Sequence, residues 1–168
     1  MDAMEAILTR RSIREYTKRR VTDEVLKELL EAAMCAPSAG NQQPWCFVVI
    51  NDREILNEIP KHHAYSQMLK EAQVAILVCC DQDLQLGGYG VQDCSAATQN
   101  ILLAAHAKGL GAVWLGVYPT EPRVTDIKKL LNLPEHIIPI SLISIGYPAE
   151  QKPRQDRYRA DRVRYNRW

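Results

Sequence analysis

The sequence predicts a layered α/β or α+β domain built around one sheet, because stretches with helical periodicity alternate with short apolar runs typical of buried strands. Hydrophobic residues make up 46% of the 168 residues and charged residues 24%, so the chain has enough apolar side chains to form a core. No internal repeat and no linker divides the sequence. We therefore expect a single domain over residues 1–168, with residues 150–168 as a C-terminal arm.

The first two expected helices are bounded by recognisable residues. A short helix is expected over residues 3–10, with Ile7 and Leu8 on its apolar side. Thr22 can cap the second helix by accepting a hydrogen bond from its first turn. Pro37 ends that helix, because proline lacks the backbone N–H that helical hydrogen bonding needs.

The later elements are bounded in the same way. Pro60 is expected to stop a helix over residues 53–59. Asp93 or Ser95 can cap the longest helix, and Gly109 closes it. The remaining expected elements are a helix over residues 124–132 and strands over residues 46–50, 74–80, 112–118 and 138–148.

Charge and cysteine usage narrow the class of protein. The net charge is only +1, so the protein as a whole does not resemble a binder of polyanions, and any basic function must be local. The five cysteines include no CxxC pair, which favours reduced, mostly buried thiols. No signal peptide opens the chain, and no apolar run approaches the ~18 residues that span a bilayer. We expect a cytoplasmic protein without a membrane partner.

Basic residues cluster in RRSIREY, residues 10–16, where Arg10, Ser12 and Arg14 occupy alternating positions. In an extended segment these side chains project to one side. Two guanidinium groups beside a hydroxyl form a receptor for a phosphate monoester, because arginine donates hydrogen bonds in a planar fork. The pattern is also typical of a solvated surface cluster, and this stretch alone leaves both interpretations open.

The loop PSAGNQQPW, residues 37–45, supplies a hydroxyl, three amides and a glycine. Amides both donate and accept hydrogen bonds, which suits a planar heterocycle with mixed edges, such as a flavin or a pterin. Amides equally favour a hydrogen-bonded turn between a helix and a strand. The residue types do not decide between a ligand site and a turn.

Several common site patterns are missing from the sequence. GLGAVWLGVYP, residues 109–119, fits neither the GxGxxG dinucleotide motif nor a P-loop. No GxSxG motif occurs, and no histidine–carboxylate spacing resembles a zinc site, so we predict no metal centre. Gly116, near the end of the third expected strand, can let a ligand ring lie against the backbone. The glycine-rich segment 83–90 is either a cover over a substrate space or a surface loop.

Two features are compatible with a homodimer. The helix over residues 94–108 carries a face of small residues, which suits either an intramolecular core or contact with a second copy. The arm from Glu150 has three aromatic residues but no core of its own, so it needs a surface on which to dock. The arm is also basic, which is found in nucleic-acid binders. Near-neutral net charge and the lack of a groove-reading motif argue against nucleic acid as a partner.

The motifs together resemble one known family. Five stretches follow one another in an order and at a spacing similar to the FMN-dependent nitroreductase family: RRSIREY, APSAGNQQPW, QDCSAATQNILLAAHAKGLGAVWLG, IGYP and a terminal YNRW. The resemblance covers nearly the whole chain, which looks like a short member. It implies an α+β, nitroreductase-like fold of three layers, with a central, mostly antiparallel sheet flanked by helices. It also implies a homodimer that exchanges its extended C-terminal tail and binds FMN at the subunit interface.

The resemblance implies which residues bind the cofactor. The segment at the FMN phosphate corresponds to Arg10, Arg11, Ser12 and Arg14. The segment along the isoalloxazine ring corresponds to Pro37, Ser38 and Ala39, and the amides contributed by the other subunit correspond to Asn41 and Gln43. The strand end under the ring corresponds to Leu115 and Gly116, and a basic residue of the tail at the phosphate to Arg154 or Arg157.

The implied activity is that of a flavoprotein oxidoreductase. NADH or NADPH would deliver hydride to FMN, and a small acceptor such as a nitroaromatic or a quinone would then enter the same space in a ping-pong cycle. No side chain is named as a catalyst, because the flavin carries the chemistry. The alternatives are a non-enzymatic FMN-holding protein and, within the same family, a reductive dehalogenase or a flavin-modifying enzyme.

Overall fold

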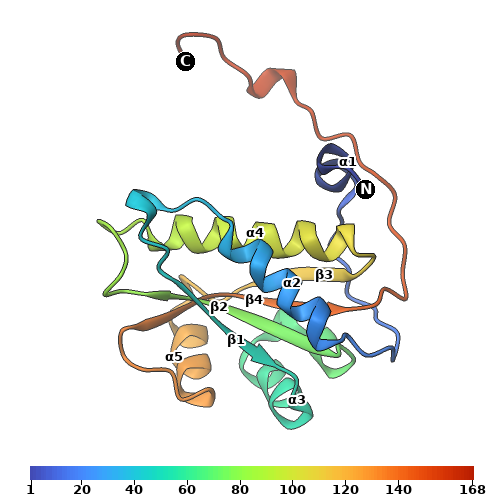
Figure 1. Ribbon diagram of the computed structural model, residues 1–168, viewed down its shortest axis with the longest axis vertical. Coiled ribbons are helices and arrows are strands. Elements are labelled where there is room, and N and C mark those ends of the chain that lie inside the picture. The colour runs from blue at the N-terminus through green and yellow to red at the C-terminus, as the bar shows by residue number, and fades with distance from the viewer.

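The computed structural model describes residues 1–168, and one four-stranded sheet forms its centre (Figure 1). The strands are β1 (Trp45–Ile50), β2 (Val74–Asp81), β3 (Gly111–Gly116) and β4 (Ile137–Gly146). Their order across the sheet is β1-β2-β4-β3, and every neighbouring pair is antiparallel. The antiparallel sheet expected from the family resemblance is confirmed.

Helices cover both faces of this sheet (Figure 1). One face carries α2 (Asp23–Met34) and α4 (Gly90–Ala107), and the other carries α3 (Arg53–His62) and α5 (Glu121–Leu130). The short helix α1 (Ala3–Thr9) contacts α4. Three 3-10 helices span Ala39–Asn41, Ala64–Lys70 and Ala160–Arg162. The expected three-layer α+β architecture is therefore confirmed.

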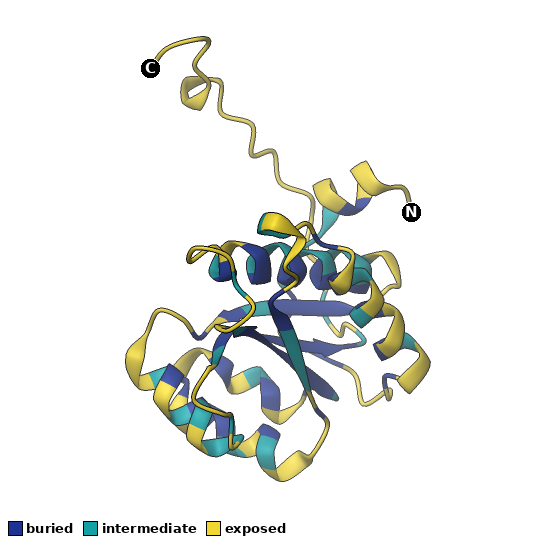
Figure 2. Cartoon of the chain, turned by 60° about the vertical axis from the view of Figure 1, so that its left-hand side comes forward, coloured by how far each residue is buried: buried dark blue, intermediate teal, exposed yellow.

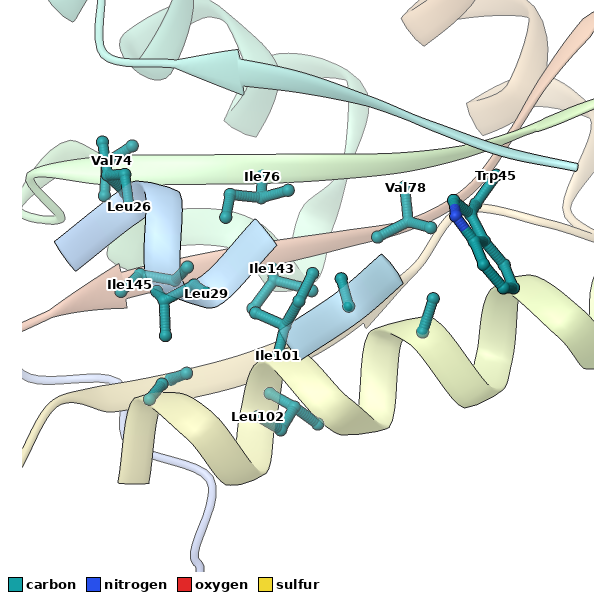
Figure 3. Packing of buried hydrophobic residues seen from close by; sticks show 14 of the residues in the cluster. Leu26, Leu29, Trp45, Val74, Ile76, Val78, Ile101, Leu102, Ile143 and Ile145 are labelled. Carbon is teal, nitrogen blue, oxygen red and sulfur yellow. The ribbon is translucent and has the colours of Figure 1, made fainter. Parts of the chain in front are cut away.

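Strand β2 shows why the domain has three layers. All of its residues except Asp81 are buried, and successive side chains point to opposite faces of the sheet. Ile76 belongs to a core cluster beneath α2 and α4, where it lies with Leu29 and Ile101 (Figure 3). Leu77 belongs to a second cluster on the other face. One apolar strand thus contributes to two cores, so both faces of the sheet need helices.

The segment after α1 lies along the edge of β3. Ser12 forms a parallel bridge with Ala112, and the Ile13 N–H donates to the Ala112 carbonyl at 3.0 Å. Gly111 permits this approach, because a Cβ on that residue would lie 2.5 Å from Ile13 Cγ2. The basic residues around Ser12 are therefore fixed against the sheet.

Two helix bounds differ from those expected. Pro60 does not stop α3, which continues to His62. Pro60 cannot donate the helical hydrogen bond of its position, but only two residues of α3 follow it, so any kink at the proline displaces little of the helix. Helix α5 begins at Glu121, three residues before the expected 124–132 segment, with a proline in its first turn, where the missing N–H has no helical partner in any case.

The start of the longest helix also differs. Helix α4 begins at Gly90, so neither Asp93 nor Ser95 caps it. The Gln85 side-chain oxygen instead accepts a hydrogen bond from the Gly90 N–H at 3.2 Å. Gly109 follows the helix with φ of 75°, which confirms it as the closing residue.

The C-terminal arm extends away from the body of the protein (Figures 1 and 2). Every residue from 151 to 168 is exposed, including the three aromatic residues. Exchange of this arm between two copies stays a prediction. None of the helices combines the length and the hydropathy that crossing a bilayer requires.

Candidate functional site

Three of the expected ligand-binding residues line one cavity of about 460 Å³ at the end of β3. These residues are Arg14, Leu115 and Gly116. The other lining residues come from the segment after α3, from β3 and from α5: His63, Ala64, Tyr65, Gln67, Met68, Trp114 and Arg123. The volume lies in the range of small-molecule sites.

The strand end at Gly116 is held from two sides. Its carbonyl oxygen accepts hydrogen bonds from His63 Nε2 at 2.9 Å and from Arg123 Nη1 at 3.1 Å. Because a carbonyl only accepts, His63 carries a proton on Nε2. Burial lowers the pKa of His63, and the positive charge of Arg123 lowers it further, so the ring is neutral at neutral pH.

The space in front of Gly116 is open. A Cβ placed on this residue would meet no atom within 4 Å, and the residue is exposed. The protein's own packing therefore does not require glycine at this position. A flat ligand could lie directly against the backbone here.

The basic segment is held by the start of the C-terminal arm. Arg11 Nε donates to the Pro153 carbonyl oxygen at 2.8 Å. Lys152 Nζ donates to the Ser12 carbonyl oxygen at 2.9 Å. The arm therefore fixes the backbone that was expected to bind a phosphate, and it places the ion pair of Lys152 with Glu150 next to Ser12 and Arg14.

Positive charge is concentrated around Arg10. Burial lowers the pKa of Arg10, and the charges of Arg157 and then Arg11 lower it further. Of the two tail arginines considered from the sequence, Arg157 rather than Arg154 is thus the one whose charge acts on Arg10. Arg11 Nη2 is buried and has no hydrogen-bond partner. This group of arginines has the charge and the free donors that an anionic ligand needs.

The amide loop is shaped by its own side chains. Ser38 Oγ accepts a hydrogen bond from the Gln43 N–H at 2.9 Å, and Gln43 Nε2 donates to Asn41 Oδ1 at 2.9 Å. Asn41 and Gln43 have φ of 55° and 51°, in the left-handed region that few side chains adopt. The loop is thus a hydrogen-bonded turn between α2 and β1. A ligand role for it and for the adjoining Pro37 and Ala39 stays a prediction.

Within one chain, the amide loop lies far from the basic segment. The Ala39 N–H donates to Asp93 near the start of α4 at 3.0 Å, whereas Thr9 is hydrogen-bonded to His106 near its end at 2.8 Å. The helix between these contacts spans about 20 Å, from a rise of about 1.5 Å per residue. Figure 1 shows the loop and α1 at opposite ends of α4. A site that contained both would require a second chain.

Comparison with known proteins places the chain in a family. It matches the Nitroreductase family over residues 7–89 and 61–147, which together cover most of its length. The chain belongs to the nitroreductase family. The resemblance inferred from the five motifs is thereby confirmed.

Individual members of the nitroreductase family are similar along their whole length. The chain is 54% identical over 169 residues to a protein from Methanothermobacter thermautotrophicus provisionally named NADH dehydrogenase/NAD(P)H nitroreductase, covering 100% of this chain and 88% of that one. A crystal structure of a protein with the same provisional name from Parabacteroides distasonis has a TM-score of 0.95 and 40% identity, covering 98% of both chains. A provisionally named nitroreductase from Desulfovibrio desulfuricans, solved in complex with FMN, has a TM-score of 0.86 and 34% identity, covering 100% of this chain and 99% of that one.

Several residues that line this cavity were not predicted from the sequence. His63 and Tyr65 flank the start of a 3-10 helix, Ala64–Lys70, which has no regular apolar periodicity to predict it. Arg123 lies in the first turn of α5, where the helix dipole disfavours a cation. An arginine in this unfavourable position could have indicated a functional residue. The sequence did not reveal it, because the predicted helix began at residue 124, after Arg123.

Proposed function

We propose that this protein is an FMN-dependent oxidoreductase that uses NADH or NADPH to reduce a small acceptor such as a nitroaromatic or a quinone. The observation that carries the proposal is that Arg14 of the arginine-rich segment lines one cavity with the open strand end at Gly116. Membership of the nitroreductase family and the FMN complex of the Desulfovibrio relative support it. The provisional name of the Methanothermobacter relative supports NAD(P)H as donor.

The residues present fit FMN. The phosphate would be held by Arg10, Arg11, the Ser12 hydroxyl, Arg14 and Arg157, where the buried Arg11 Nη2 has no partner within the chain. The ring would lie against Leu115 and Gly116, with Arg14 in the same cavity. A second copy would contribute its amide loop, Pro37–Gln43, because that loop lies at the far end of α4 in its own chain.

When bound, FMN would supply the redox chemistry, which is to take up a hydride from NAD(P)H and pass it to the second substrate. The protein's part is to bind and orient these molecules. His63 and Arg123 hold the Gly116 carbonyl, so the surface beneath the ring is fixed before any ligand arrives. The positive charge of Arg14 and Arg123 favours negatively charged or partly negative oxygen atoms in the cavity, such as those of a nitro group or a quinone. Donor and acceptor would use the one cavity in turn, which is the structural basis of ping-pong turnover.

Anaerobic reduction of the purified protein tests the proposal. The protein should be yellow, should release FMN on heating, and should be bleached by NADH or NADPH. Adding an acceptor from a panel of nitroaromatics and quinones should restore the colour. A colourless protein that does not take up FMN would refute cofactor binding. Bound FMN that neither donor reduces would identify the protein as a non-enzymatic FMN holder.

A further inference from the structure

Arg123 has an arrangement that the binding of FMN does not explain. The cavity at the end of β3 is lined by two arginines, Arg14 and Arg123, and by no carboxylate. Arg14 belongs to the segment assigned to the phosphate, whereas Arg123 comes from α5. Neither side chain forms an ion pair.

The position of Arg123 is unfavourable for the helix that carries it. Arg123 occupies the first turn of α5, where free N–H groups already produce a positive potential. A cation near this end destabilises the helix, whereas an anion near this end would stabilise it. Glu121 lies in the same turn and offsets part of this charge, but only Arg123 of the turn lines the cavity, so the cavity itself faces a positive group.

The hydrogen bonds of Arg123 leave donors free. Its Nη1 donates to the Gly116 carbonyl at 3.1 Å, and its Cζ lies 5.5 Å from the centre of the Tyr65 ring. These contacts hold the guanidinium in place but use only one of its five N–H donors. Tyr65 is 71% exposed, so the pair lies at the open side of the cavity, where an entering molecule would meet it.

We propose that Arg123, supported by Tyr65, recognises an anionic oxygen group on the molecule that reacts in this cavity. The group is either a carboxylate on a planar aromatic or quinonoid acceptor or a phosphate of the nicotinamide donor. This inference rests on the proposed function, because it names the substrate class of that same site. Arg123 is then a specificity-determining residue, and the Gly116 carbonyl positions it.

The test compares ligands that carry an anionic oxygen group with ligands that lack one. The acceptor pair is 4-nitrobenzoate and 4-nitrobenzamide, and the donor pair is NADH and 1-benzyl-1,4-dihydronicotinamide, which has no phosphate. For each pair the ratio of kcat/KM values is measured in the wild type, in Arg123→Gln and in Arg123→Lys. Arg20→Gln is the matched control, because it removes an exposed arginine elsewhere on the surface.

Arg123→Gln should lower the charged-to-uncharged ratio about tenfold or more for one of the pairs, as expected for loss of a hydrogen bond between charged groups. Arg123→Lys should retain part of the ratio, because it keeps the charge but not the planar fork. A change in the acceptor pair identifies the carboxylate, and a change in the donor pair identifies the phosphate. Equal losses for charged and uncharged ligands, or the same change in Arg20→Gln, would overturn the inference.

Binding measurements separate this inference from the proposed function. Calorimetric titration of the flavin-loaded, oxidised protein with 4-nitrobenzoate and 4-nitrobenzamide needs no turnover. If the loaded protein accepts no hydride but binds the carboxylate more tightly, and Arg123→Gln abolishes that preference, the proposed function fails and the inference stands. If the wild type shows no preference for the anion in either binding or turnover, the inference is wrong. Flavin content and thermal unfolding of each variant show whether the fold is retained.

Discussion

At the scale of single residues, two glycines in the same strand have different physical reasons for lacking a side chain. Gly111 begins β3 and packs against Ile13, so a Cβ there would overlap a side chain. Gly116 ends β3 and has free space before it. The first glycine is explained by packing within the chain. The second is explained only by something outside it, which is why Gly116 is central to the proposed site.

Alanine substitutions should separate these two roles. Gly116→Ala should leave folding intact but weaken FMN retention, because its methyl group would occupy the space in which the ring is expected to lie. Gly111→Ala should lower the free energy of unfolding by about 1–3 kcal/mol, because it overpacks the contact with Ile13. Urea unfolding and flavin content after gel filtration measure the two effects. Full flavin retention in Gly116→Ala would show that the ring does not lie against this residue.

The arginines of the N-terminal segment should contribute to FMN binding mainly through the phosphate. Replacing Arg10 and Arg14 together with alanine should raise the dissociation constant for FMN about a hundredfold or more, because hydrogen bonds to charged groups contribute about 1.5–3 kcal/mol each. The double variant Lys18→Ala/Arg20→Ala removes the same charge from exposed positions and should bind FMN normally. Riboflavin, which has no phosphate, should bind the wild type and the Arg10/Arg14 variant alike. Fluorescence titration gives each constant, and a matching loss with riboflavin would remove the phosphate assignment.

At the scale of elements, two neutral histidines join parts of the chain that are distant in sequence. The Thr9 hydroxyl donates to the Glu5 carbonyl, so it accepts from His106 Nε2 and ties α1 to α4. His63 ties the segment after α3 to the end of β3. Burial lowers the pKa of both histidines, with added effects from Arg10 and Arg11 at His106 and from Arg123 at His63, while Glu5 partly opposes the shift at His106.

These shifts predict that acid destabilises the protein. A histidine whose pKa is lower in the folded state stabilises the fold fully above the unfolded pKa of about 6.5 and loses this contribution as the pH falls below that value. Urea midpoints should therefore fall between about pH 7.5 and about pH 5.5. The double variant His63→Gln/His106→Gln should show a smaller fall, because an amide can donate the same hydrogen bonds without titrating. His136→Gln, at an exposed position, is the control, and an unchanged slope in the double variant would contradict the assignment.

At the scale of the whole molecule, several exposed apolar surfaces fit the proposed homodimer. Two side chains on the apolar side of α1 are exposed, with Ile7 52% and Leu8 39% accessible. A cavity of about 470 Å³, lined mostly by apolar residues of α1, α2 and α4, lies beside them. The arm over residues 151–168 is exposed throughout (Figure 2). A second copy of the chain would cover these surfaces and would bring an amide loop to each basic segment.

Truncation of the arm should reveal this assembly. Deleting residues 154–168 removes Arg157 and the aromatic residues but keeps the contacts of Lys152 and Pro153 with the basic segment. The core should stay folded, because none of the deleted residues is buried. The dimer and the bound FMN should both be lost or strongly weakened. Light scattering and flavin content measure this, and a truncated protein that stays dimeric and fully loaded would show that the arm is dispensable.

Much of the fold was predictable because local patterns determine it. The apolar runs of the strands, the Thr22 cap and the Gly109 closure are signals contained within a few neighbouring residues, and the structure confirms them. The bounds that failed depend on context. Pro60 is tolerated because only two residues of α3 follow it, and Gly90 begins α4 because the side chain of Gln85, in the preceding loop, folds back to accept from its N–H.

By itself, the sequence determined the family and the layered architecture and supplied the candidate ligand-binding residues, because these depend on residue order and periodicity. Only the tertiary structure decided which of those residues meet. It joined Arg14 to Gly116, added His63 and Arg123, and left the amide loop at the other end of α4. The physical reason is that the site forms where a strand end, a helix start and an irregular segment converge, and that convergence depends on the packing of the sheet rather than on any local stretch of sequence.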